Sequence, residues 1–357
     1  MVLHRLRSAP APLISLADAA ITGLWAVVGL RRPGTLPERD RTLRLRVAGR
    51  EVVARDENVV ALTLTSADGS TLPAWHPGAH LDIHLPSGRI RQYSLCGDPL
   101  RRNEYRIAVR RIPNGGGGSI EVHDALPVGS TVTTSGPRNA FPLSVPGYGS
   151  PTQRVRFIAG GIGITPILPM LGTAERLGIN WSMIHVGRSA ESIPFLDEVR
   201  RFGERIEIRT DDVDGIPGAD DLLGECPDGT TVYACGPAEM LTAVRQRLVG
   251  RDDVELHYER FAAPPVIDGS PFSVTIGSTG ARVDVGPDET LLAALQRAGA
   301  GVPYSCQQGF CGTCRTRVLA GIVDHRDTLL TAPERDAGMM LTCVSRAPAG
   351  GDLTLDL

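Results

Sequence analysis

The sequence has 357 residues and no lysine, so all 37 of its basic residues are arginines. This absence excludes a Walker P-loop lysine, a Schiff-base lysine and a lysine general base. The net charge of -3 and the pI of about 6.3 show no basic excess and give no reason to expect a nucleic-acid partner. Hydrophobic residues make up 42% and charged residues 22%, which is ordinary for a soluble globular protein, and the length predicts two or three domains.

Clean apolar runs long enough to span a membrane are scarce as well. The run at 13–30 is interrupted by Asp18 and diluted by Thr22, Gly23 and Gly29, and no small-residue cleavage site follows it. Its apolar residues recur at helical spacing, which predicts one amphipathic helix within an N-terminal extension, residues 1–41. We expect this helix to pack on protein. Peripheral membrane contact through residues 1–40, helped by flanking arginines, and a true spanning helix are the alternatives.

Cysteine is sparse, and four of the seven cysteines follow one spacing. Cys306, Cys311 and Cys314 form a Cys-x4-Cys-x2-Cys loop, and Cys343 follows downstream. This is the ligand spacing of a plant-type 2Fe-2S cluster. The glycines at 309 and 312 permit a tight backbone whose N–H groups can point at the sulfurs.

The alternatives for this loop are a zinc site and reduced structural cysteines. Zinc sites usually pair two Cys-x2-Cys knuckles, and a three-plus-one layout fits that pattern poorly. Cys96, Cys226 and Cys235 are left as free thiols, an odd number that argues against a disulfide framework. We therefore expect a reducing, cytoplasmic location.

Residues 42–147 predict a small antiparallel β-barrel, because short alternating segments are separated by Gly, Pro and Asp-Gly turns. Two features stand out in it. The first is the segment Arg91-Gln92-Tyr93-Ser94-Leu95. The second comes after a strand-like segment around Val109 and is the glycine run Asn114-Gly115-Gly116-Gly117-Gly118-Ser119. The glycine run predicts a loop whose N–H groups approach an anion closely; a floppy hairpin loop is the alternative.

Residues 148–262 alternate strand and helix patterns and predict a parallel sheet. A buried strand at 155–159 leads into Gly160-Gly161-Ile162-Gly163-Ile164-Thr165-Pro166 and then a helix at 167–176. Such a turn places backbone amides and a helix N-terminus against a pyrophosphate. A second strand ends before Arg188, and a last one, 231–234, ends at Cys235-Gly236-Pro237.

Residues 263–270 are rich in proline and glycine and predict a linker. After it, residues 271–357 begin with strand patterns at 272–276 and 281–285 and a helix at 290–298, ahead of the cysteine loop. This order predicts a β-grasp ferredoxin domain. The fold class is therefore multidomain α+β.

Together the Arg-x-Tyr-Ser segment, the glycine turn and Tyr-Ala-Cys-Gly-Pro resemble the ferredoxin-reductase superfamily. The order of domains is similar to the phthalate dioxygenase reductase family, which includes vanillate demethylase reductases. The resemblance implies a flavin site made by Arg91, Tyr93, Ser94, Leu95, Val109, Gly117, Gly118 and Ser119. It implies a nicotinamide site made by Gly160, Gly161, Gly163, Thr165, Arg188, Cys235, Gly236 and Pro237. Ser94, Cys235, Glu259 and Phe261 would lie at the reacting centre; for Cys235, a small buried core residue is the alternative.

The activity implied by the resemblance is an electron relay from NADH through FMN and a 2Fe-2S cluster to a Rieske-type terminal oxygenase acting on an aromatic or hydrophobic substrate. FAD is the alternative to FMN. Arg188-Ser189 favours the phosphate of NADPH, whereas the family favours NADH, which we expect here. Two other hypotheses remain: an NADPH-dependent reductase for a membrane desaturase or hydroxylase, and a zinc or redox sensor.

Overall fold

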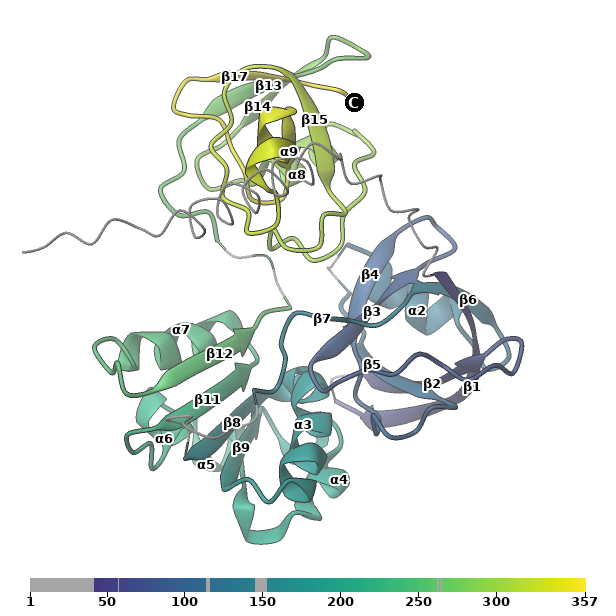
Figure 1. Cartoon of the computed structure of the whole chain (residues 1–357), viewed down its shortest axis with the longest axis vertical. Coiled ribbons are helices and arrows are strands. Elements are labelled where there is room, and N and C mark those ends of the chain that lie inside the picture. The colour runs from purple at the N-terminus through teal and green to yellow at the C-terminus, as the bar shows by residue number, and fades with distance from the viewer. Residues whose placement is uncertain (1–41, 57, 114–115, 145–152, 262, 264) are drawn as a thin grey trace, which may run out of the picture. The chain divides into compact units, whose positions relative to one another are not determined.

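The computed structural model describes residues 42–56, 58–113, 116–144, 153–261, 263 and 265–357, which build three separate sheets (Figure 1). The predicted amphipathic helix lies outside these residues, as does part of the predicted linker. No helix in the described part of the chain has the length and apolarity to cross a membrane. All seven cysteines are free thiols.

The first sheet has seven strands and is antiparallel, as the alternating segments predict. Its order is β4-β3-β6-β1-β2-β5, with β7 paired to β3, and an isolated bridge between Leu95 and Ile107 joins the end of edge strand β4 to edge strand β5. The strands are β1 (Thr42–Ala54), β2 (Val59–Ser66), β3 (Ala79–His84), β4 (Ile90–Ser94), β5 (Tyr105–Arg110), β6 (Thr131–Ser135) and β7 (Arg138–Asn139).

A short helix, α2 (Gly118–Ala125), follows β5 where the sequence predicts only a glycine loop. Gly117 precedes it in the left-handed conformation, with φ of 75°, which glycine adopts at little cost. The expectation of a loop through Ser119 is therefore wrong at its end, because Gly118 and Ser119 are the first residues of a helix.

The second sheet is parallel, with the order β10-β9-β8-β11-β12. The prediction that 231–234 forms the last strand is wrong, because β12 follows and pairs with β11, Cys235 opposite Glu259. The strands are β8 (Arg154–Gly160), β9 (Trp181–Gly187), β10 (Ile206–Thr210), β11 (Thr230–Cys235) and β12 (Glu255–Glu259). The helices are α3 (Ile164–Arg176), α4 (Leu196–Arg200), α5 (Asp211–Asp214), α6 (Ala219–Leu223) and α7 (Ala238–Arg247).

The third sheet has the order β14-β13-β17-β15-β16 and carries the ferredoxin fold. Helix α8 begins as predicted, since the Thr290 hydroxyl accepts a hydrogen bond from the Ala293 N–H at 3.1 Å. The elements are β13 (Phe272–Ile276), β14 (Arg282–Val285), α8 (Leu291–Arg297), β15 (Arg315–Ala320), α9 (Ala332–Asp336), β16 (Met339–Leu341) and β17 (Asp352–Leu355).

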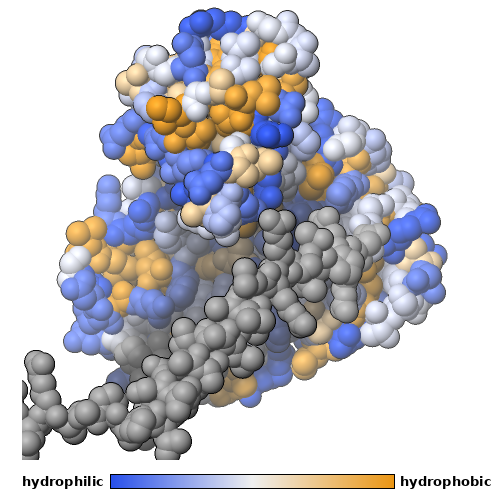
Figure 2. Space-filling view, turned by 45° about the horizontal axis from the view of Figure 1, so that its top comes forward, coloured by the Kyte–Doolittle hydropathy of each residue, from blue (hydrophilic) through white to orange (hydrophobic). Residues whose placement is uncertain are grey.

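The hydrophobic cores divide differently from the sheets. One buried cluster joins residues of the first sheet, such as Val59 and Cys96, to residues of the second, such as Phe157 and Leu168. The core of the ferredoxin fold is a separate cluster. Figure 2 shows apolar residues grouped on the ferredoxin fold at the top of the view, whose exposed apolar side chains include Leu319, Ile322 and Leu329.

Candidate flavin and iron–sulfur site

A cavity of about 280 Å³ brings together residues from all three folds. Nine of the predicted flavin, nicotinamide and reacting-centre residues line it, together with the cluster cysteine Cys306. The nine are Arg91, Tyr93, Ser94, Val109, Gly118, Ser119, Thr165, Glu259 and Phe261. Clefts with a largely apolar wall and a few convergent polar groups are typical cofactor sites.

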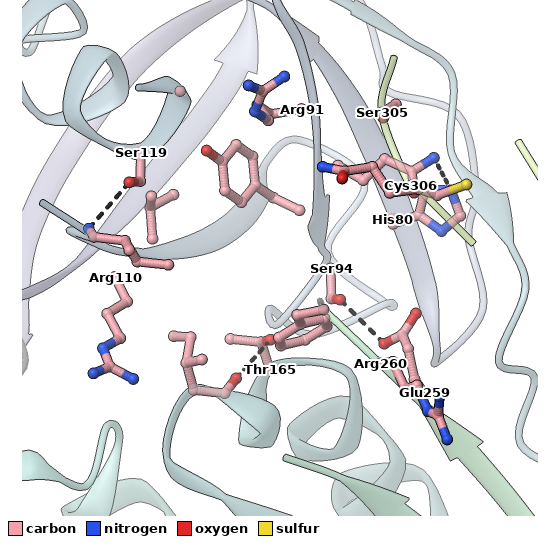
Figure 3. A pocket seen from close by; sticks show the side chains of 18 of the residues that line it. His80, Arg91, Ser94, Arg110, Ser119, Thr165, Glu259, Arg260, Ser305 and Cys306 are labelled. Carbon is pink, nitrogen blue, oxygen red and sulfur yellow. Dashed lines mark hydrogen bonds between the residues drawn. The ribbon is translucent and has the colours of Figure 1, made fainter. Parts of the chain in front are cut away.

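One part of the cavity wall holds Ser94 and Glu259 (Figure 3). The Ser94 hydroxyl donates a hydrogen bond to Glu259 Oε2 at 3.4 Å. Loss of water around the Glu259 carboxyl raises its pKa to about 8, against which the Ser94 hydrogen bond acts. Near neutral pH this carboxyl is largely protonated and can donate a hydrogen bond or a proton into the cavity.

Figure 3 shows Arg91 and Ser119 apart from this pair, near the start of α2. A Cβ on Gly118 would lie 2.6 Å from Arg91 Cγ and Nε, so only glycine leaves room for that side chain. The Ser119 hydroxyl accepts from the Ile112 N–H at 3.1 Å, and its own proton has no acceptor among the described residues. An arginine, a hydroxyl and the free N–H groups of a helix N-terminus form a phosphate-binding set.

Two turns that the sequence assigns to the nicotinamide cofactor pack directly on each other. A Cβ on Gly163 would lie 2.1 Å from the Cys235 carbonyl oxygen, and one on Gly160 would lie 2.6 Å from Pro237 Cδ. The predicted glycine turn is itself helical, since a 3₁₀ turn over Gly161–Gly163 runs into α3 at Ile164. The expected helix start at 167 is therefore three residues late, and Thr165 lies inside the helix.

Cys235 ends β11 and is fully buried in the core shared by the first two sheets. Burial, with the carboxyl of Glu259 nearby, raises the pKa of its thiol well above the usual range. The neutral thiol is therefore a poor nucleophile, and any role at the site is one of packing and of fixing the turn that follows.

Arg188 follows β9 at the same edge of the sheet. Its carbonyl accepts a hydrogen bond from the Asp212 N–H at 3.1 Å, and the hydroxyl of its neighbour Ser189 donates to Asp56 Oδ2 at 2.9 Å. The Asp56 carboxylate thus contacts the residue that follows Arg188.

The cysteine loop has the geometry that a cluster needs. Gln307, Gly309 and Gly312 all have positive φ, of 56°, 80° and 78°, and the Gln308 N–H donates to Cys306 Sγ at 3.3 Å. A Cβ on Gly309 would lie 2.8 Å from Val344 Cγ2, so the chain around the loop is closely packed. Amide hydrogen bonds to sulfur favour the thiolate that ligates iron.

The four predicted cysteine ligands meet at this loop. The Cys306 thiol is hydrogen-bonded to those of Cys311 and Cys343, and the Cys314 thiol to that of Cys343. These hydrogen bonds lower the pKa of Cys306 and Cys314 and raise the pKa of Cys311 and Cys343. This group of four thiols, of which three are buried and Cys311 is half-buried, fits a 2Fe-2S cluster.

Across the described residues, no group of three His, Cys, Asp or Glu side chains is placed to hold a single metal ion. A two-iron cluster divides its four ligands between two irons, so pairs of thiols, rather than three converging on one point, suit it.

Several predicted residues do not line the cavity, and others that do were not predicted. Leu95 is fully buried in the core of the first sheet, and Gly117, Gly160, Gly161, Gly163, Arg188, Cys235, Gly236 and Pro237 lie outside the lining. His80, Arg110, Arg260, Gln308 and Phe310 line the cavity without having been predicted. Gln308 and Phe310 lie inside the predicted cysteine loop, whereas His80, Arg110 and Arg260 come from three other segments, so no single motif covers the set.

Comparison with known proteins agrees with this arrangement. The family described as "Oxidoreductase FAD-binding domain" matches residues 44–142, and "2Fe-2S iron-sulfur cluster binding domain" matches residues 274–348. The chain is 39% identical to the phenoxybenzoate dioxygenase subunit beta of Ectopseudomonas oleovorans, over 84% of this chain and 93% of that protein.

It is also 39% identical to the vanillate O-demethylase oxidoreductase of a Pseudomonas species, over 87% of this chain and 98% of that one. The solved structure of phthalate dioxygenase reductase, described as modular for electron transfer from pyridine nucleotides to [2Fe-2S], matches with a TM-score of 0.65 and 34% identity. That match covers 90% of this chain and all of that one. The chain is thus an oxidoreductase with a flavin-binding and a 2Fe-2S domain, and it belongs to the family of phthalate dioxygenase reductase and vanillate O-demethylase oxidoreductase.

Proposed function

We propose that this chain is the reductase component of an oxygenase system and passes electrons from NADH, through FMN and a 2Fe-2S cluster, to a terminal oxygenase. The observation that carries the proposal is the cavity, because Ser94, Glu259 and the cluster cysteine Cys306 all line it. When bound, the flavin accepts a two-electron hydride and the cluster carries single electrons. The relatives that are named as parts of dioxygenase, monooxygenase or demethylase systems support an oxygenase as the acceptor.

The residues of the chain bind, orient and exclude water. Arg91, Gly118 and Ser119 would hold the flavin phosphate, and Tyr93 and Val109 would pack beside its ring. Ser94 and Glu259 would provide hydrogen bonds at the reacting edge. Cys306, Cys311, Cys314 and Cys343 would ligate the cluster.

The choice of FMN rests on the phosphate set. Arg91 and the start of α2 make one compact group of anion ligands, which matches a single phosphate. The alternative, FAD, is favoured by the description of the family that matches residues 44–142.

The choice of NADH rests on charge. The Asp56 carboxylate accepts from the Ser189 hydroxyl, and the main-chain N–H of Asp212, the second residue of the acidic helix α5, donates to the Arg188 carbonyl. Carboxylates accept hydrogen bonds from a ribose hydroxyl but repel a phosphate.

We also propose the predicted domain limits at 41/42, 147/148, 262/263 and 270/271, with a cytoplasmic location. Arg326 Nη1 donates to the Ile267 carbonyl at 2.6 Å, and Arg346 Nη2 donates to that of Ser270 at 3.1 Å. The end of the proposed linker, 263–270, is therefore fixed to the ferredoxin fold.

The experiment is the visible spectrum of the purified protein before and after anaerobic addition of NADH, and in parallel of NADPH. We expect flavin and iron–sulfur absorption, both bleached much faster by NADH, and FMN as the flavin released by acid. Faster bleaching by NADPH would overturn the choice of nucleotide, and released FAD would overturn FMN. A colourless protein prepared without oxygen would support the sensor instead.

A further inference from the structure

Arg91, the central residue of the phosphate set, is held by a side chain of the ferredoxin fold. Its Nη2 donates to the Tyr304 hydroxyl at 2.6 Å and to the Gly116 carbonyl at 3.0 Å. The guanidinium carbon also lies 4.4 Å from the centre of the Tyr304 ring. The two residues are 213 positions apart in the chain. A stacked, hydrogen-bonded arginine loses most of its freedom before any ligand arrives.

The hydrogen bond leaves the Tyr304 hydroxyl with a proton to give. Guanidinium has donors only, so the tyrosine oxygen must accept from Arg91. Within the part of the chain that the structure describes, the proton of this hydroxyl has no acceptor. A half-buried donor beside an arginine is placed to meet an anion.

The missing side chain of Gly116 leaves room for the contact between Tyr304 and Arg91. A Cβ on Gly116 would lie 2.8 Å from the Tyr304 hydroxyl oxygen and 3.0 Å from Arg91 Nη2. Gly116 lines the cavity, and α2 begins two residues later with its N–H groups free of side-chain caps. Tyr304, Arg91 and the start of α2 thus meet at one place.

We propose that the ferredoxin domain completes the flavin-phosphate site through Tyr304, whose hydroxyl orients Arg91 and donates its proton to the phosphate. The proposal rests on the flavin function proposed above, and it adds a ligand from outside the flavin domain.

Flavin binding and docking of the ferredoxin fold are thermodynamically linked. If phosphate binding strengthens the contact of Tyr304 with Arg91, then docking of the ferredoxin fold strengthens flavin binding by the same factor. Two further contacts join the same surfaces, since Phe310 packs edge-on against His80 at 6.4 Å and the Gln308 amide donates to the Arg260 carbonyl. The cofactor would then help to fix the cluster beside it.

The test compares FMN with riboflavin, which lacks the phosphate, on flavin-depleted full-length protein by fluorescence quenching. Tyr304→Phe keeps the stacked ring and loses only the hydroxyl. We expect FMN affinity to fall by about tenfold, the usual cost of one hydrogen bond to a charged group, while riboflavin affinity stays unchanged. The matched control is Tyr258→Phe, because Tyr258 is exposed and lies outside the cavity lining.

Gly116→Ala is the second variant, and it acts from the other side of the contact. Its added methyl group would push Tyr304 and Arg91 apart, so it should lower FMN affinity selectively in the same way. The iron content of both variants shows that the cluster domain is intact.

Unchanged FMN affinity in Tyr304→Phe, or an equal loss for FMN and riboflavin, would overturn the proposal. Failure of the FMN assignment would be visible separately, as FAD released from the wild-type protein.

Discussion

The cysteine loop and the flavin cavity place their groups in different ways. In the loop, three ligands come from residues 306–314, and the backbone sets their directions through positive φ at Gln307, Gly309 and Gly312. In the cavity, side chains arrive from three sheets, and Ser94 and Glu259, which share one hydrogen bond, are 165 positions apart. The loop is a local structure, whereas the cavity exists only when the folds are packed together.

The packing itself also differs between the folds. The first two sheets share a continuous buried core, which fixes the flavin and nicotinamide sides to each other. The ferredoxin fold keeps its own core and meets the cavity through polar and aromatic contacts such as Tyr304 with Arg91. Loss of a cluster ligand should therefore be severe and confined to the ferredoxin side, whereas a cavity residue should have graded effects.

The largest effect is expected for Cys311→Ser. A hydroxyl is a poor replacement for a thiolate ligand, so the cluster should be lost or strongly perturbed. We expect NADH to reduce the flavin at the wild-type rate, while delivery to cytochrome c falls close to background. Stopped-flow absorbance measures the first rate, and steady-state cytochrome c reduction measures the second.

Cys226→Ser is the matched control, since Cys226 is half-buried and outside the cluster loop. It should leave both rates unchanged. Wild-type delivery in Cys311→Ser would mean that the cluster does not lie between the flavin and the acceptor.

What could be predicted from the sequence follows the same division. Three of the four cluster ligands lie in one short loop, and the glycine turn after β8 is one continuous segment, so their spacing identifies them. Residues that meet only through packing could not be found in this way, because neither Tyr304 nor His80 carries a signal of its partner. The hydrogen bond between Arg91 and Tyr304 cannot be predicted from their positions in the chain, which are 213 residues apart.

The two wrong predictions about the fold, for β12 and α2, have local causes as well. Strand β12 has the sequence Glu-Leu-His-Tyr-Glu, and its charged residues hide an edge strand. Helix α2 begins inside a run of glycines, which are poor helix formers, so the sequence predicts a loop where the helix starts. Both elements are set by tertiary packing, and β12 is the one that brings Glu259 opposite Cys235.

An intermediate effect is expected where the two turns of the parallel sheet touch. In Gly163→Ala the new methyl group would overlap the Cys235 carbonyl, so the turns must separate. We expect a loss of about 1–3 kcal/mol in the free energy of unfolding, as for other overpacked sites, and a higher KM for NADH. Urea unfolding and steady-state kinetics measure the two.

Gly172→Ala is the matched control within α3, where the added Cβ comes no closer than 3.6 Å to Arg176 Nη1. It should stabilise the protein by about 0.5–1 kcal/mol, because alanine is the better helix former. Equal effects of the two substitutions would show that contact between the turns is not what Gly163 provides.

The smallest effect, a pH dependence, belongs to the cavity side of the comparison. The Glu259 carboxyl has an ordinary pKa of 4.5 and one of about 8 in the folded protein. Between these values the folded state holds a proton that the unfolded state has lost, so this group lowers the free energy of unfolding as pH rises from about 4.5 to 8. Glu259→Gln removes the titration, and its stability relative to wild type should therefore rise over that window. Ser94→Ala sharpens the test, because the Ser94 hydrogen bond lowers the pKa of Glu259, and its loss should extend the wild-type slope to higher pH.

Urea unfolding at closely spaced pH values gives all three curves. If the curves of wild type and Glu259→Gln ran parallel, the Glu259 carboxyl would be ionised in the folded protein. It would then have no proton to donate into the cavity.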